Sequence, residues 1–67
     1  MKIKLNNREE EFAGDKLTVE EIIALKSFAF KMLVVRLNDH PVKKEMYSST
    51  FVSEGDDLKV IHLVSGG

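Results

Sequence analysis

The sequence predicts an α+β domain in which a mixed sheet of four to five strands wraps around one main helix. Three observations predict it: an alternating apolar start, one well-capped amphipathic helix, and a strand-like segment near the end. A helix with one apolar face needs a sheet to cover that face. Because the helix lies on the path between the first and last strands, these two strands can pair in parallel at the centre of the sheet.

The chain opens with a predicted hairpin. Its first apolar residues alternate with polar ones, which is the period of a half-buried strand: Met1, Ile3 and Leu5. Asn6-Asn7 follows as a turn, since Asn tolerates left-handed backbone. Residues 8–12 then return as a second strand, and residues 13–16 end it.

The helix start is the clearest local signal. Thr18 can cap the helix and Glu21 can complete a capping box, while Leu17 can pack onto Ile22 as a hydrophobic staple. We expect the helix to end near residues 26–27 and the apolar segment 28–30 to plug the open end of the core.

The remaining segments are predicted as strands joined by turns. We expect a strand over 32–37, a turn over 38–41, a short edge strand from Val42, a short helical turn within 46–51, a turn over 54–57 and a last strand over 58–64. The predicted core lies between helix and sheet and consists of Ile3, Leu5, Val19, Ile22, Ile23, Val35, Leu37, Leu58 and Val60.

Composition restricts the classes of function. The 67 residues allow one domain, spanning 1–67, and their net charge is −1, which offers no broad positive field to nucleic acid or anionic membrane. Cysteine is absent, which excludes thiolate chemistry and fits the cytoplasm. No apolar run approaches the ~18 residues that span a bilayer.

No internal catalytic or metal site is expected. His40 and His62 have no partners at metal-ligand spacing, and Ser48-Ser49-Thr50 lacks a nucleophile turn. Gly14 and Gly55 stand alone, so no phosphate-binding glycine pattern is present. We therefore expect a chain that is not an enzyme and binds no cofactor itself.

The candidate site is the end of the chain, Ser65-Gly66-Gly67. Glycine has no Cβ, so this backbone can pass through a slot too narrow for other residues. It follows directly from a predicted strand, which fixes its root. Such a tail suits a partner enzyme that works on the carboxylate of Gly67, and that enzyme must supply the ATP and the catalyst for activation.

Alternation also predicts a partner-binding surface on the outer face of the sheet. If Leu58 and Val60 face the helix, the aliphatic residues Val34, Ile61 and Leu63 point the other way. We expect them to be rimmed by basic residues: Lys2, Lys4, Arg36 and Lys59. Burying this patch would favour association, and its charges would steer an acidic partner surface.

The ordered set of motifs resembles the ubiquitin-like sulfur carriers, and among them those of bacterial thiamine biosynthesis. The resemblance spans nearly the whole chain and rests on Ile3-Lys4-Leu5-Asn6, Leu17-Thr18-Val19-Glu20-Glu21-Ile22, Val34-Val35-Arg36-Leu37-Asn38, Tyr47 with Thr50, Glu54-Gly55-Asp56 and Gly66-Gly67. Asn7 and Asp39 depart from it, because the family often has Gly in these turns.

The resemblance implies a β-grasp (ubiquitin-like) fold and a thiocarboxylate on Gly67. It implies three partners: an E1-like adenylyltransferase that uses ATP, a sulfur donor system, and thiazole synthase as the acceptor of the sulfur. Two alternatives stay open at this point. One is the small subunit of molybdopterin synthase, whose sulfur serves the molybdenum cofactor. The other is a β-grasp protein modifier or binding module.

Overall fold

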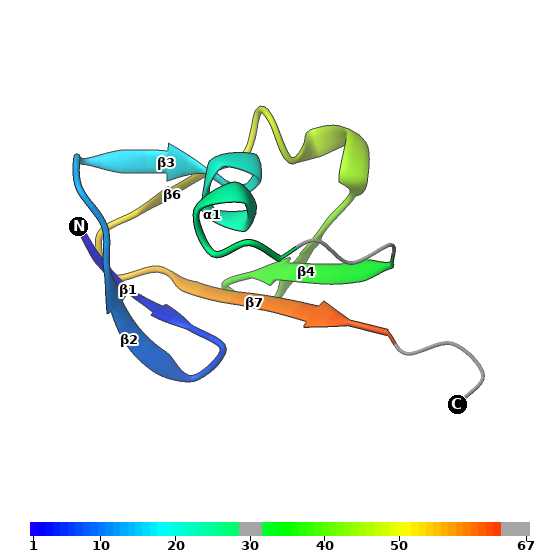
Figure 1. The fold of residues 1–67 in the computed structure, drawn as a ribbon, viewed down its shortest axis with the longest axis horizontal. Coiled ribbons are helices and arrows are strands. Elements are labelled where there is room, and N and C mark those ends of the chain that lie inside the picture. The colour runs from blue at the N-terminus through cyan, green and yellow to red at the C-terminus, as the bar shows by residue number, and fades with distance from the viewer. Residues whose placement is uncertain (29–31, 64–67) are drawn as a thin grey trace.

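A five-stranded mixed sheet and one helix that lies across its inner face make up most of the molecule (Figure 1). The computed structural model describes residues 1–28 and 32–63. The strand order is β2-β1-β7-β4-β5, formed by β1 (Lys2–Leu5), β2 (Arg8–Glu11), β4 (Leu33–Leu37), β5 (His40–Val42) and β7 (Asp57–His62). The predicted α+β class is therefore confirmed.

The helix and the second sheet complete the fold. They are α1 (Val19–Leu25), the two-stranded sheet of β3 (Lys16–Thr18) and β6 (Phe51–Ser53), and the 3₁₀ turn η1 (Lys44–Met46). No helix within residues 1–28 and 32–63 is long and apolar enough to span a bilayer.

The first and last strands pair in parallel at the centre of the sheet, as predicted. Leu5 lies opposite Leu58 in the β1–β7 ladder. On its other side β7 runs antiparallel to β4, where Val60 lies opposite Val35. Strand β7 is thus paired with both β1 and β4 in its first half, and the pairing with β4 continues to His62.

Both hairpins of this sheet turn on two residues with positive φ. Asn6 and Asn7 have φ of 51° and 68°, and Asn38 and Asp39 have φ of 50° and 67°. Positive φ at both central positions is the type I′ arrangement, whose twist matches that of the flanking strands. The turn at Asn6-Asn7 predicted from asparagine chemistry is confirmed.

Helix α1 begins and ends with regular hydrogen-bonded caps. The Thr18 hydroxyl accepts the Glu21 N–H at 3.1 Å, and the Glu21 carboxylate accepts the Thr18 N–H at 2.9 Å, which confirms the predicted capping box. At the other end Phe28 N–H donates to the Ile23 carbonyl at 3.0 Å, with Ser27 at a φ of 57°. These bonds form a Schellman motif, which ends the helix where the sequence predicts.

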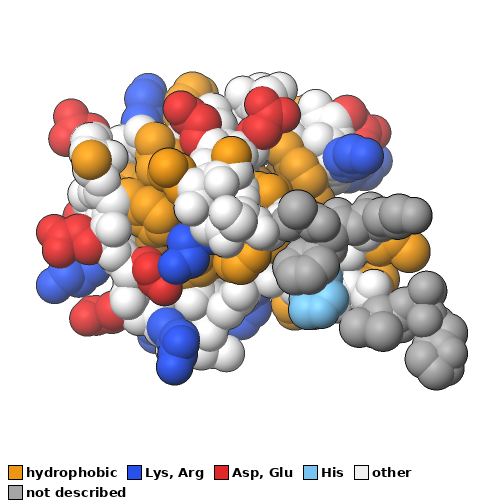
Figure 2. All heavy atoms as spheres, in the orientation of Figure 1, with side chains coloured by type: hydrophobic (Ala, Val, Ile, Leu, Met, Phe, Trp, Pro, Cys, Tyr) orange, Lys and Arg blue, Asp and Glu red, His pale blue; other side chains and the backbone are white. Residues whose placement is uncertain are grey.

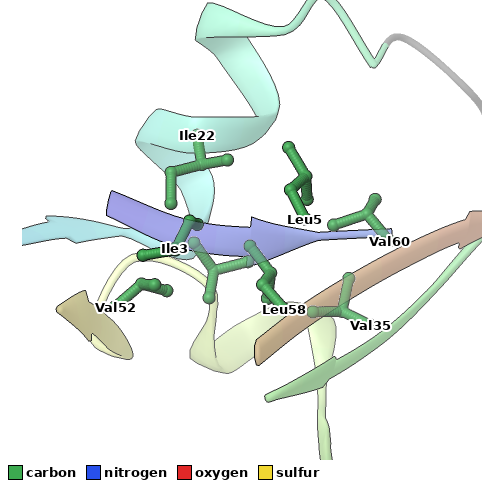
Figure 3. Packing of buried hydrophobic residues seen from close by; sticks show 8 residues of the cluster. Ile3, Leu5, Ile22, Val35, Val52, Leu58 and Val60 are labelled. Atoms are coloured by element: carbon green, nitrogen blue, oxygen red, sulfur yellow. The ribbon is translucent and has the colours of Figure 1, made fainter. Parts of the chain in front are cut away.

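The core lies between α1 and the sheet (Figure 3). Ile22 points from the helix toward the strand residues. Within residues 1–28 and 32–63, eight hydrophobic side chains are buried: Ile3, Leu5, Val19, Ile22, Val35, Val52, Leu58 and Val60. Ile23 and Leu37 were expected inside but are half-buried and pack against this cluster. Phe28 also packs against it, whereas residues 29 and 30 lie outside the described residues.

The segment 46–51 differs from the prediction. The helical turn occurs earlier, at Lys44–Met46, and Phe51 begins strand β6. Strand β6 exists because Val52 lies opposite Leu17 of β3 and is fully buried against the core. Strand β7 also begins one residue earlier than expected, at Asp57, and Val64 lies outside the described residues.

Candidate functional site

The root of the tail is tied to the central sheet. Ser65, Gly66 and Gly67 lie outside the described residues. The chain leads to them from β7, and just beyond this strand the Leu63 N–H donates to the Met32 carbonyl at 3.0 Å. The tail therefore leaves from a strand whose other end is packed in the core.

The predicted outward residues lie together on the outer face of the sheet. Val34 is the cross-strand partner of Ile61, and Arg36 is the partner of Lys59. The exposed fractions are 39% for Val34, 48% for Ile61 and 49% for Leu63. The predicted orientation is confirmed, and binding of a partner at this face stays a prediction.

Met32 belongs to the same surface and was missing from the predicted set. It is 53% exposed, and its carbonyl joins it to Leu63, one step beyond the Leu33–His62 pair. The two-residue period that identified Val34 and Arg36 also includes position 32, so the signal was present in the sequence. We call Met32, Val34, Ile61 and Leu63 the tail-root patch.

The charged rim is mixed rather than basic, so the expectation of a basic rim was wrong. Lys59 Nζ lies 3.7 Å from Asp57 Oδ2, which is on the same face because β7 begins at Asp57. Arg36 Nη2 donates to the Asp39 carbonyl at 2.6 Å.

At the far edge of this face, acidic β2 residues lie opposite the β1 lysines in the pairs Lys2–Glu11 and Lys4–Glu9. The face drawn in Figure 2 likewise intersperses acidic and basic side chains, without a broad area of one sign. The outer face therefore offers an apolar end at the tail root and a balanced, charged end at β1 and β2.

Two hydroxyls of the Ser48-Ser49-Thr50 segment have structural roles. Ser49 Oγ and Thr50 Oγ1 both donate to the Met46 carbonyl, at 3.3 and 2.7 Å, which is capping chemistry. Glu10 forms an ion pair with Lys26 at 3.1 Å between β2 and the helix end. Within the described ranges, no three His, Cys, Asp or Glu side chains gather closely enough to hold a metal ion.

Burial raises the pKa of the Tyr47 hydroxyl above its ordinary value. Desolvation disfavours the phenolate, so this hydroxyl ionises only at a more alkaline pH than an exposed tyrosine does. This shift follows from packing against the core and creates no group poised for acid–base catalysis near pH 7.

Comparisons with known proteins agree with this geometry. The model of the ThiS family matches residues 3–67. Sulfur carrier protein ThiS of Bacillus subtilis (strain 168) is 25% identical over 65 residues, which cover 97% of this chain and 98% of that protein.

Two solved structures of a thiamine biosynthesis protein from Geobacter metallireducens are similar in fold. The crystal structure, described as ThiS, has a TM-score of 0.85 at 26% identity and covers 100% of both chains. The NMR solution structure has a TM-score of 0.77 at 28% identity and covers 100% of this chain and 88% of that one. The β-grasp-like architecture of one helix and a mixed five-stranded sheet is thus shared, and the family match over residues 3–67 shows that this chain belongs to the ThiS family.

Proposed function

We propose that this chain is a sulfur carrier whose working group is the carboxylate of Gly67 and whose sulfur enters thiazole formation in thiamine biosynthesis. The observation that carries the proposal is the ThiS family match, which extends through residue 67 and so includes the diglycine. The name of the Bacillus subtilis relative, a sulfur carrier protein, supports the same reading.

The chemistry begins with a poor electrophile. A carboxylate gains a good leaving group when its oxygen attacks the α-phosphate of ATP, which releases pyrophosphate and leaves an acyl-adenylate. Sulfide from the donor then attacks the carbonyl carbon and displaces AMP, and a thiocarboxylate results. An E1-like adenylyltransferase would hold the ATP, and a sulfur donor system would supply the sulfur.

The carrier itself contributes position rather than catalysis. The Leu63 N–H donates to the Met32 carbonyl, so the chain is held to the sheet as far as Leu63. A partner that gripped the tail-root patch would hold Gly67 near its own active site, because two patch residues, Ile61 and Leu63, come shortly before the tail in the chain. We therefore propose that the chain is a substrate of its partner enzymes and not an enzyme.

The acceptor of the sulfur is proposed to be thiazole synthase. Both Geobacter metallireducens structures are described as a thiamine biosynthesis protein, which favours this acceptor over molybdopterin synthase. The proposal places the chain in the cytoplasm, because its activation consumes ATP.

The test is intact-mass measurement after incubation with an E1-like adenylyltransferase, ATP and a sulfur source. We expect one oxygen of the Gly67 carboxylate to be replaced by sulfur. Omitting ATP should abolish the mass change, because the carboxylate then lacks a leaving group.

The matched control is a variant extended by one residue beyond Gly67, which moves the carboxylate out of position while leaving the folded part intact. We expect the extended variant to remain unloaded. Equal loading of the two forms would contradict the proposal.

A further inference from the structure

A hollow lies away from the tail root, at the edge of the sheet formed by β5. It is a groove of about 470 Å³, lined by Leu37, Asn38, His40, Pro41, Val42, Lys43, Met46 and Thr50. Its lining is mainly apolar, and a site of this size falls within the range of about 300–1,000 Å³ that accepts ligand groups.

The groove opens on the opposite side of the sheet from the tail-root patch. Leu37 lies opposite Leu58, and Val42 lies opposite Val35. Both partners are buried in the core, and directly opposed residues in a sheet share a face. Leu37 and Val42 therefore belong to the inner face, so a protein bound to the outer patch leaves the groove accessible.

The far wall of the groove is held in place. Met46 ends η1 and is 48% exposed. Its carbonyl accepts hydrogen bonds from Thr50 Oγ1 at 2.7 Å and from Ser49 Oγ at 3.3 Å. The floor of Leu37 and Val42 packs against the core. A groove with an anchored wall and a packed floor exists before binding, which lowers the entropy cost of docking.

The backbone at this edge disfavours an added β-strand. In the β4–β5 hairpin, Leu37 lies opposite His40 next to the turn, and Val42 lies opposite Val35. Pro41 lies between them, where backbone groups point away from β4, and it has no N–H to donate. This favours an occupant that binds through its side chains, as an amphipathic helix does in a groove.

The charge of the groove specifies the occupant further. Of the lining residues, Lys43 carries a positive charge and none carries a carboxylate. In the adjacent η1, Lys44 and Glu45 are both exposed, and their charges offset each other. An apolar side chain flanked by carboxylates could pack on the floor of Leu37 and Val42 while its carboxylates face Lys43. The flexible thioether of Met46 can adapt to different anchors.

We propose that the groove between β5 and η1 is a docking site for an acidic amphipathic segment of a second protein, which inserts an apolar side chain between Leu37, Val42 and Met46. This inference rests on the proposed carrier function only in that a carrier must meet more than one protein. The groove would provide one of those proteins with a binding surface separate from the tail-root patch.

The test is an NMR titration of the isotope-labelled carrier with a short capped helical peptide whose apolar face carries Leu flanked by Glu. We expect saturable shifts of the Leu37, Val42 and Met46 amides. A peptide with Lys in place of Glu should bind at least tenfold more weakly, and one with Ser in place of Leu should not bind. Met46→Glu should abolish binding, whereas Met32→Glu on the outer face should leave it unchanged.

Three results would overturn the proposal. One is that the Lys peptide binds as tightly as the Glu peptide, and another is that the shifts centre on Met32 and Ile61. The third is that the groove amides shift with protein concentration alone, which would make a second copy of the chain the occupant. The titration uses the carrier without ATP or partner enzymes, so its failure is distinct from failure of thiocarboxylate loading.

Discussion

At the scale of single residues, two asparagines connect the hairpin turns to the central strand. Asn6 Oδ1 accepts the Val60 N–H at 2.8 Å, and Asn38 Oδ1 accepts the Asp57 N–H at 2.9 Å. In each case the side chain replaces a backbone acceptor at a point where the neighbouring strand has already turned away. The first turn residue thus satisfies a β7 donor, whereas no such role applies to the second turn residue, Asn7.

This asymmetry predicts opposite effects of glycine at adjacent positions. Asn7→Gly should raise the free energy of unfolding by about 0.5 kcal/mol, because Asn-Gly is preferred in type I′ turns and Gly removes left-handed strain. Asn6→Gly should lower it by about 1–2 kcal/mol, because the Val60 N–H loses its acceptor. Urea denaturation of both variants measures these changes, and a change of equal sign and size would contradict the assignment.

The sequence could predict the turns but not these side-chain hydrogen bonds to β7. Paired Asn residues between two strand patterns indicate a tight turn through local chemistry alone. The bond from Asn6 to Val60 joins residues 54 positions apart, so it depends on the parallel β1–β7 pairing rather than on any local pattern.

At the scale of elements, the end of α1 shows a residue in a conformation that it does not favour. Ser27 has a φ of 57° at the position after the helix cap, and the Phe28 N–H reaches back to the Ile23 carbonyl. Glycine is the usual residue at this position because the left-handed backbone costs L-residues roughly 1 kcal/mol. Ile23 and Phe28 both pack against the core, so tertiary contacts hold the motif in place.

Ser27→Gly should therefore stabilise the protein by about 0.5–1 kcal/mol, or several degrees in melting temperature. Ser27→Ala is the matched control, because it also removes the hydroxyl but keeps the Cβ that causes the strain. Calorimetry should show a gain for glycine alone. A similar gain for alanine would mean that the hydroxyl, and not the backbone, is the source of the cost.

The β3–β6 sheet is the element that sequence reasoning missed. Each strand has three residues, which is too short for a two-residue alternation to stand out. The strands form because Leu17 and Val52, which are far apart in the sequence, pair with each other and both pack into or against the core. Val52 follows the helical turn predicted within 46–51 and was assigned to no element, although it is fully buried.

At the scale of the whole molecule, one small core determines whether the chain folds. Ile22 is fully buried, whereas Leu25 on the same helix is 62% exposed. Ile22→Ala should cost about 2–4 kcal/mol, from the lost transfer energy and the cavity left behind. Leu25→Ala should change stability by less than about 0.5 kcal/mol. Thermal melts of the two variants compare the positions directly, and similar losses would show that the helix face is misassigned.

The outer face could be predicted in part for a physical reason. Strand alternation assigns Val34 and Ile61 to one face whatever their neighbours are, and the register confirms it. The charge of the rim depends on which strands adjoin, and the acidic residues of β2 become neighbours of Lys2 and Lys4 only through the hairpin register. A sequence pattern shows which way a side chain points, and pairing decides which charges it meets.

The mixed rim changes what recognition at the tail root can depend on. With Lys59 close to Asp57 and acidic β2 residues opposite Lys2 and Lys4, long-range steering by a positive surface is weak. Affinity should then come from burying the tail-root patch, at roughly 25 cal/mol per Å² before entropy losses. Ionic strength should accordingly affect the affinity for a partner only slightly.

Ile61→Asp tests this surface. Ile61 is 48% exposed and lies opposite Val34, so a charge there should leave the fold intact while placing an unpaired carboxylate in the middle of the patch. We expect binding to the E1-like adenylyltransferase to weaken by at least about tenfold, or 1.4 kcal/mol. Leu63→Asp should act in the same way. Phe51→Asp is the matched control, because Phe51 is similarly exposed at 51% but belongs to the β3–β6 sheet. Calorimetric affinities that stay unchanged in both patch variants, each shown to be folded, would place recognition on another surface.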